Sequence, residues 1–183
     1  TPLVGIVTRL VGHKGVDLMR EVLEKSLWER DIQYVVLGSG EWQYESYFRE
    51  LHDKYPDKVG LRLGFVPDLA RKIYAGADLF LMPSKSEPCG LSQMVALRYG
   101  TLPIVRETGG LKDSVTDSGD GQGNGFTFKS YDAYDMLGAI YRAVDAYNNK
   151  EYWPTLVERA LRCDMSWGKS ANEYIKMYKS LLK

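Results

Sequence analysis

The sequence predicts an α/β protein with a doubly wound parallel sheet, and three observations lead to this prediction. Short runs of aliphatic and β-branched residues alternate with longer runs whose apolar residues recur at helical spacing. Glycine, proline or aspartate marks each change between the two kinds of run. The chain has 183 residues, of which 44% are hydrophobic, and this is enough to bury a core as one domain spanning residues 1–183.

Six short apolar segments are predicted to be strands. In chain order they are Leu3–Thr8, Tyr34–Leu37, Val59–Leu63, Leu79–Met82, Pro103–Val105 and, with the weakest pattern, Gly125–Phe128. Strands that are separated by helices are joined by right-handed crossovers, so we expect them to run parallel.

The segments between the strands carry the apolar stripes of amphipathic helices. Four helices are predicted at Gly15–Glu29, Trp42–Tyr55, Asp68–Ala77 and Leu91–Gly100, the last with Gly100 as its C-cap. After a turn-rich loop, "DSGDGQGNG", three more helices are predicted at Ala133–Asn148, Tyr152–Leu161 and Lys169–Leu182. This order of elements is Rossmann-like, and such folds bind ligands outside the carboxyl ends of their strands.

Charge and composition argue against several kinds of partner. The 24 basic and 24 acidic residues cancel, so no net field favours nucleic acid or an anionic membrane. His13 and His52 lack metal-ligand spacing, and we expect no metal and no cofactor. Cys89 and Cys163 make no disulfide framework, which favours a reducing compartment. We expect no membrane span and no leader, and a strand that begins almost at Thr1 suggests a domain cut from a longer chain.

Two cations flank the first strand-to-helix junction, "TRLVGHKG". Arg9 ends the strand and Lys14 precedes the helix, so both could converge on one anion. A planar guanidinium and a compact ammonium together suit a diphosphate. The alternative is a pair of solvated loop cations. The next junction, "LGSGE", either lets the backbone approach a ligand or simply makes a tight turn.

The junction after the fourth strand, "SKSEPCGLSQM", is the richest in candidate residues. The first amides of the following helix, near Gly90, Leu91 and Ser92, lack partners within the helix and form a candidate anion site. Glu87 is a poor neighbour for phosphate unless it faces sugar hydroxyls or a developing positive centre; alternatively, it favours the helix N-terminus electrostatically. Cys89 is either a reactive thiol or a small packing residue.

Two further features lie at the ends of strands. Thr108, Gly109 and Gly110, in "ETGGLKDSV", separate a strand from a helical turn, and this pattern is typical of a close backbone approach. Phe65 follows the third strand, where it either stacks on a base or belongs to the core.

Together these motifs resemble one family. "TRLVGHKGVDL", "EPCGL" followed by "ALRYGT" and "TGGL", and the closing "DMSWGKSANEYIKMYKSLL" are similar to the C-terminal nucleotide-sugar-binding domain of bacterial glycogen synthases and plant starch synthases. These are retaining glycosyltransferases of family 5, whose GT-B fold places two Rossmann-like domains around a cleft. The family commonly has Gln where His13 stands and Tyr where Phe65 stands. The resemblance implies that this chain is one half of such an enzyme, without the N-terminal domain.

The resemblance also implies roles for the residues at these junctions. Cations matching Arg9 and Lys14 bind the diphosphate, and the glutamate matching Glu87 contacts the transferred glucose near its reacting centre. The aromatic matching Phe65 stacks on adenine, and the segment from Cys89 to Ser92 faces the sugar and diphosphate. The candidate catalytic residues are thus Glu87, Arg9 and Lys14, and the candidate donor-binding residues are Arg9, Lys14, Phe65, Glu87, Cys89, Gly90, Leu91, Ser92, Thr108, Gly109 and Gly110.

The implied reaction transfers glucose from ADP-glucose to the 4-hydroxyl of an α-1,4-glucan with retention, in the bacterial cytoplasm or in a plastid. The implied partners are ADP-glucose or ADP, and a glucan acceptor held by the missing N-terminal domain; nucleic acid and membrane are not expected. The isolated domain should bind nucleotide without catalysing transfer, and residues 166–183 should be loosely held because the family's chain end crosses to the other domain. Two alternatives stay open, a binding-only module and a nucleotide-sugar epimerase of the same architecture.

Overall fold

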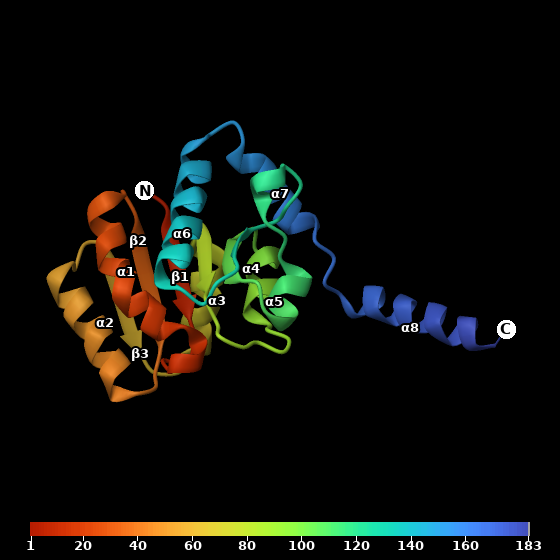
Figure 1. Cartoon of the computed structure of the whole chain (residues 1–183), viewed down its shortest axis with the longest axis horizontal. Helices are drawn as coiled ribbons and strands as arrows, with labels where there is room; N and C mark the ends of the chain where they lie inside the picture. Colours follow the sequence, from red (N-terminus) through yellow and green to blue (C-terminus); the bar gives the residue numbers. More distant parts are fainter. Residues whose placement is uncertain (183) are drawn as a thin grey trace.

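A six-stranded parallel sheet forms the centre of the protein in a computed structural model that describes residues 1–182 (Figure 1). Its strand order is β3-β2-β1-β4-β5-β6, and every neighbouring pair is parallel. The strands are β1 (Leu3–Val7), β2 (Gln33–Gly38), β3 (Val59–Leu63), β4 (Leu79–Met82), β5 (Leu102–Arg106) and β6 (Phe126–Phe128). The predicted class and all six predicted strands are confirmed.

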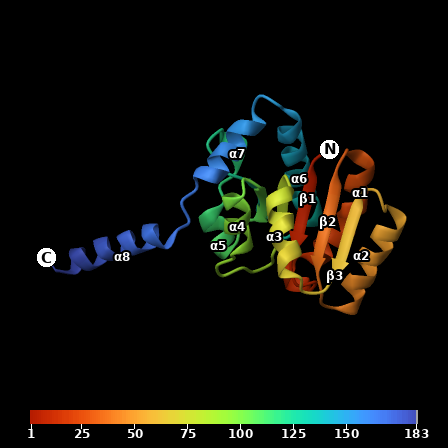
Figure 2. The same cartoon turned by 180° about the vertical axis from the view of Figure 1, so that it is seen from behind.

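Helices cover both faces of this sheet. On one face lie α1 (Val16–Glu29), α2 (Trp42–Lys54) and α6 (Ala133–Asn148). The other face, which is toward the viewer in Figure 2, carries α3 (Pro67–Gly76), α4 (Ser92–Arg98) and α5 (Gly109–Ser114). α7 (Trp153–Arg162) packs against α4 and α6. The chain changes direction in the sheet between β1 and β4, so the crevice outside their carboxyl ends is the expected ligand site.

The core forms where the central strands meet the apolar stripes of the helices. The stripe predicted for α1 is confirmed, since its five apolar residues are all buried: Val16, Met19, Val22, Leu23 and Leu27. They pack in one cluster with Ile6 of β1, Leu79 of β4 and Ile104 of β5. Each fully buried aliphatic side chain contributes about 1.5–3 kcal/mol, so this packing stabilises the sheet whose carboxyl edge carries the loops with candidate residues.

Some predicted boundaries were wrong. α4 has seven residues, fewer than the predicted Leu91–Gly100, although Gly100 does follow it with a left-handed φ of 79°, as a helix stop requires. Residues 1–182 also contain two short 3₁₀ turns, η1 (Gly12–Lys14) and η2 (Ser118–Asp120), that were not predicted. A three-residue turn is too short to show a periodic pattern, so sequence reasoning missed both.

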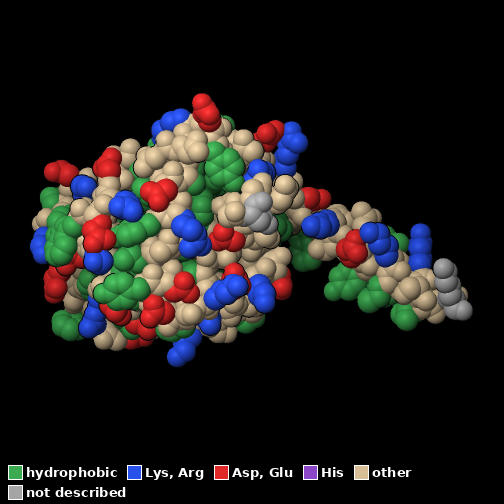
Figure 3. All heavy atoms as spheres, turned by 45° about the horizontal axis from the view of Figure 1, so that its top comes forward, with side chains coloured by type: hydrophobic (Ala, Val, Ile, Leu, Met, Phe, Trp, Pro, Cys, Tyr) green, Lys and Arg blue, Asp and Glu red, His purple; other side chains and the backbone are tan. Residues whose placement is uncertain are grey.

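The last helix, α8 (Trp167–Leu181), begins two residues before its predicted start and stands away from the rest of the chain (Figure 1). None of its residues is buried. Figure 3 shows hydrophobic side chains gathered along one side of α8. The exposed large hydrophobic residues of this helix are Trp167, Tyr174, Ile175, Met177, Tyr178 and Leu181. Within residues 1–182, no helix is both long and apolar enough to cross a membrane.

Candidate functional site

A cavity of about 220 Å³ lies at the carboxyl edge of the sheet, beside the predicted crevice. Its walls come from the ends of β1 and β2, the connection from β3 to α3, and the start of α4; they include Thr8, Arg9, Gly38, Phe65, Tyr74 and Ser92. Complete small-molecule pockets usually measure about 300–1,000 Å³. This cavity therefore suits one flat group of a ligand whose remaining atoms extend over the neighbouring loops.

Phe65 lies at the mouth of this cavity and is 90% exposed. The preceding residue, Gly64, has a φ of 122°, a conformation that turns the chain outward and favours glycine. The structure thus excludes the core alternative for Phe65. Its ring is free to stack on a planar ligand.

Arg9 also lines the cavity, at the end of β1. Its Nη2 atom lies 3.3 Å from Nε2 of His13, so the imidazole holds the guanidinium from the side of η1. Ser92 faces the same cavity, and its Oγ accepts a hydrogen bond of 3.0 Å from the hydroxyl of Tyr74. Together with Phe65, three of the predicted donor-binding side chains therefore reach one cavity from different loops.

Lys14 and Glu87 form a direct ion pair, which the sequence did not predict. The distance from Lys14 Nζ to Glu87 Oε2 is 2.5 Å, and the two side chains are only 19% and 12% exposed. Ser84 Oγ donates to the same carboxylate oxygen at 3.1 Å. Because water reaches this pair poorly, the attraction between the two charges is stronger than in a solvated surface pair.

The backbones of two loops pack together to bring these charges into contact. Gly15 has a φ of 79°, and a Cβ at this position would lie 2.2 Å from the carbonyl oxygen of Pro83. The amide of Lys85 donates to the carbonyl of His13 at 2.9 Å. Only a glycine at position 15 permits this approach, so the β1–α1 and β4–α4 loops carry Lys14 and Glu87 to the same place.

The Thr-Gly-Gly segment supports the Glu87 loop from the other side. A Cβ at Gly109 would lie 2.2 Å from the carbonyl oxygen of Glu87, and one at Gly110 would lie 1.9 Å from that of Cys89. The amide of Gly110 already donates to Glu87 O at 3.0 Å. Thr108 is the N-cap of α5, without a side-chain capping bond. The close approach predicted for these glycines is confirmed, and what they approach is the loop itself.

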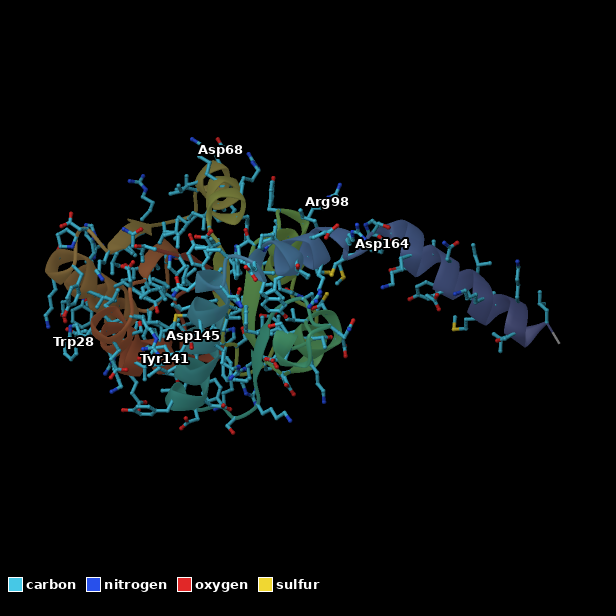
Figure 4. All side chains as sticks on the ribbon, turned by 90° about the horizontal axis from the view of Figure 1, so that it is seen from above. Trp28, Asp68, Arg98, Tyr141, Asp145 and Asp164 are labelled. Carbon is cyan, nitrogen blue, oxygen red and sulfur yellow. The ribbon has the colours of Figure 1, made fainter. Side chains whose placement is uncertain are left out.

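Cys89 and Leu91 point their side chains to different surroundings. The thiol of Cys89 is exposed. Leu91 is 70% exposed and faces a larger, mainly apolar groove of about 680 Å³ between α4 and the segment that joins α7 to α8. Figure 4 shows Arg98 and Asp164 near the base of α8, and both line this groove. Leu91 is the only candidate residue in its walls, so we assign the site to the smaller cavity at the sheet edge.

Sequence reasoning singled out none of three supporting residues, because their roles depend on contacts between distant segments. Tyr131 donates from its hydroxyl to Asp17 Oδ1 at 2.6 Å, and burial together with this carboxylate raises the pKa of the Tyr131 phenol. Arg106 donates to the carbonyl of Lys85 at 2.9 Å, and its guanidinium lies 5.5 Å from the centre of the Tyr131 ring. Gln93 is buried beneath the loop that carries Cys89.

In residues 1–182, no group of three or more His, Cys, Asp or Glu residues is placed to hold a metal ion.

The doubly wound sheet and the loops at its switch point define the class of this protein, a Rossmann-like domain of the GT-B glycosyltransferase type. The sequence profile of the family described as Glycosyl transferases group 1 matches residues 1–154. The chain belongs to this family.

Relatives extend the similarity to the whole chain. A glycogen synthase of Bacillus cereus (strain ATCC 10987) is 51% identical over 185 residues, which is 100% of this chain and 39% of the relative. One from Geobacillus thermodenitrificans is 52% identical and is 38% covered. The catalytic domain of starch synthase IV from Arabidopsis thaliana, solved with ADP and acarbose, superposes with a TM-score of 0.87 at 42% identity, over 98% of this chain and 38% of that one. The chain thus spans about two fifths of the length of these relatives.

More distant structures show the fold alone. The Anabaena protein Alr3699/HepE, solved with UDP and glucose, superposes with a TM-score of 0.69 at 20% identity, over 97% of this chain and 48% of that one.

Proposed function

We propose that residues 1–183 form the donor-binding domain of a glycogen or starch synthase, which transfers glucose from ADP-glucose to the 4-hydroxyl of an α-1,4-glucan with retention. The main support for the proposal is the arrangement of charges and an aromatic ring at the switch point. A largely buried Lys14–Glu87 ion pair lies there, and the neighbouring cavity is lined by Arg9 and by the exposed Phe65. The identity of about half with glycogen synthases, and the ADP bound to the similar starch synthase, support it.

In this proposal the cations act on the diphosphate. Negative charge builds up on the leaving ADP as the anomeric C–O bond breaks, so groups held near the diphosphate lower the barrier most. Arg9 offers two parallel hydrogen bonds and Lys14 a compact positive charge. Adenine would stack on Phe65, with the diphosphate crossing from the cavity toward Lys14.

Glu87 acts on the sugar in the same proposal. Its Oε2 accepts from Lys14 and Ser84, whereas Oε1 has no hydrogen-bond partner within residues 1–182. That second oxygen is available to a glucose hydroxyl or to positive charge that develops at the anomeric carbon.

A titration of the chain with ADP, UDP and adenosine tests the proposal. We expect ADP to bind more tightly than UDP, because stacking of a purine on Phe65 adds about 0.5–1.5 kcal/mol. Arg9→Ala and Lys14→Ala should each weaken ADP binding by about 1–3 kcal/mol through loss of a charge-assisted contact. Lys58→Ala is the matched control, since Lys58 lies at the amino end of β3. Normal ADP affinity in both site variants would contradict the proposal.

The same preparation separates the synthase proposal from its alternatives. Transfer requires acceptor and donor to be held together in a closed site from which water is excluded. Given ADP-glucose and a glucan primer, residues 1–183 should bind the donor but neither extend the primer nor epimerise the sugar. Chain extension by these residues alone would show that the acceptor site lies within them, and epimerisation would favour that alternative.

A further inference from the structure

Gln93 is a fully buried polar side chain in the first turn of α4, directly beneath the loop from Cys89 to Leu91. Its Nε2 atom lies 3.1 Å from the carbonyl oxygen of Cys89 and 3.0 Å from that of Gly90. Oε1 of the same amide is buried without a hydrogen-bond partner in the described chain. Leaving an acceptor buried and unpaired is unfavourable. The buried position of Gln93 is therefore explained by the hydrogen bonds that Nε2 donates to these two carbonyls, and not by Oε1.

The two carbonyls that Gln93 holds determine where two amides point. In a planar trans peptide the C=O of one residue and the N–H of the next point in opposite directions. When Gln93 draws the carbonyls of Cys89 and Gly90 inward, the amides of Gly90 and Leu91 turn outward. Neither amide donates to any group within residues 1–182. Both remain available to an external acceptor.

The neighbours of Gln93 tie the same loop to Glu87. Nε2 also lies 3.1 Å from Ser114 Oγ, which donates to the carbonyl of Gly110 at 2.6 Å. The amide of Gly110 in turn donates to the carbonyl of Glu87. Gly90 has a φ of 73°, and a Cβ there would lie 2.5 Å from Gln93 Oε1, so the loop passes Gln93 as closely as its backbone permits.

We propose that Gln93 is a positioning residue for the donor diphosphate: it orients the amides of Gly90 and Leu91 so that they donate to phosphate or sugar oxygens. This inference rests on the proposed function. The outward amides come from the loop peptides themselves, so their direction depends on Gln93 more than on the short helix that follows.

Replacing Gln93 by Met, which has a similar size but no donor, tests the inference. The ADP affinity of Gln93→Met should fall about tenfold, as expected for loss of charge-assisted hydrogen bonds to the diphosphate. Adenosine affinity should stay unchanged, because the cavity at Phe65 is intact. Gln93→Glu should weaken ADP binding further, since a carboxylate repels the two carbonyls. Ser26→Ala is the control, because Ser26 is also buried and bonded to a carbonyl but lies far from the loop, in α1.

A second measurement needs no variant. In ¹⁵N–¹H spectra of the unaltered chain, the amides of Gly90 and Leu91 should shift on addition of ADP and remain in place on addition of adenosine. If ADP binds yet these amides do not move, or if Gln93→Met is folded and keeps the ADP-to-adenosine affinity ratio, the inference about Gln93 is wrong while the proposed function stands. If the unaltered chain binds ADP no better than adenosine, the proposed function itself fails.

Discussion

At the scale of single residues, the contact between Lys14 and Glu87 changes what a substitution should do. The family resemblance implies that Glu87 contacts the sugar and Lys14 the diphosphate, and on that basis Glu87→Ala is expected to leave ADP affinity nearly unchanged. In the folded chain the two groups are 2.5 Å apart. If the diphosphate binds Lys14 as proposed, the carboxylate and the diphosphate compete for one ammonium, because both carry negative charge.

We accordingly expect Glu87→Gln to bind ADP several-fold more tightly, about 0.5–1 kcal/mol, because the competing charge is removed. The same change should lower the free energy of unfolding by about 1–3 kcal/mol, because Lys14 is left largely buried without its counter-ion. Calorimetric titration and urea unfolding measure the two effects. Glu24→Gln is the control, since Glu24 pairs with Lys54 on the surface of α1 and α2. Weaker ADP binding by Glu87→Gln would contradict the competition.

At the scale of elements, the carboxylate of Asp117 stabilises the connection from α5 to β6 through hydrogen bonds. Asp117 Oδ2 accepts from the amide of Thr127 at 2.7 Å and from Arg142 Nη2 at 3.0 Å, and Oδ1 accepts from the amide of Gly119 at 2.9 Å. Burial alone would raise the pKa of Asp117, but these hydrogen bonds and the guanidinium outweigh it and hold the pKa below its ordinary value. The ionised form is thus the one that stabilises the turn-rich loop predicted from the sequence.

Because the pKa of Asp117 is lower in the folded state than in the unfolded state, the free energy of unfolding should fall as the pH is lowered. The stabilisation by Asp117 is complete above the unfolded-state pKa of about 3.9 and is lost as the pH falls through the lower folded-state value. Asp117→Asn should reduce the free energy of unfolding by about 1–3 kcal/mol at pH 7, and by less at about pH 3. Urea unfolding at both pH values checks this. Asp68→Asn is the control, because Asp68 lies on the exposed side of α3 (Figure 4). A deficit that is equal at both pH values would contradict the assignment.

At the scale of the whole molecule, α8 is the helix that buries none of its described residues. Its apolar side chains stay largely exposed, and a helix of 15 residues is marginal in water on its own. Amide exchange should therefore be fast throughout Trp167–Leu181 and slow in α6, whose apolar residues are buried. Removal of residues 166–183 should leave the melting temperature nearly unchanged. Slow exchange in α8 would show that its apolar stripe is covered in solution.

The sequence by itself determined the elements and their order, because apolar periodicity and turn residues act over a few neighbouring positions. The six strands, the stripe of α1 and the glycine that follows α4 were all predictable in this way. So were the loops that carry candidate residues, since parallel strands bring their carboxyl ends to one edge.

Only the tertiary structure decided which groups meet at that edge. Lys14 and Glu87 lie 73 residues apart in the chain, and their contact depends on the packing of Gly15 against the backbone of Pro83. Phe65 lies outside the core because Gly64 turns the chain outward. In the sequence Gln93 is one polar residue among many, and only the structure shows that it is buried beneath Cys89 and Gly90. Such contacts arise when segments that are distant in the sequence pack together, so a pattern of neighbouring residues cannot predict them.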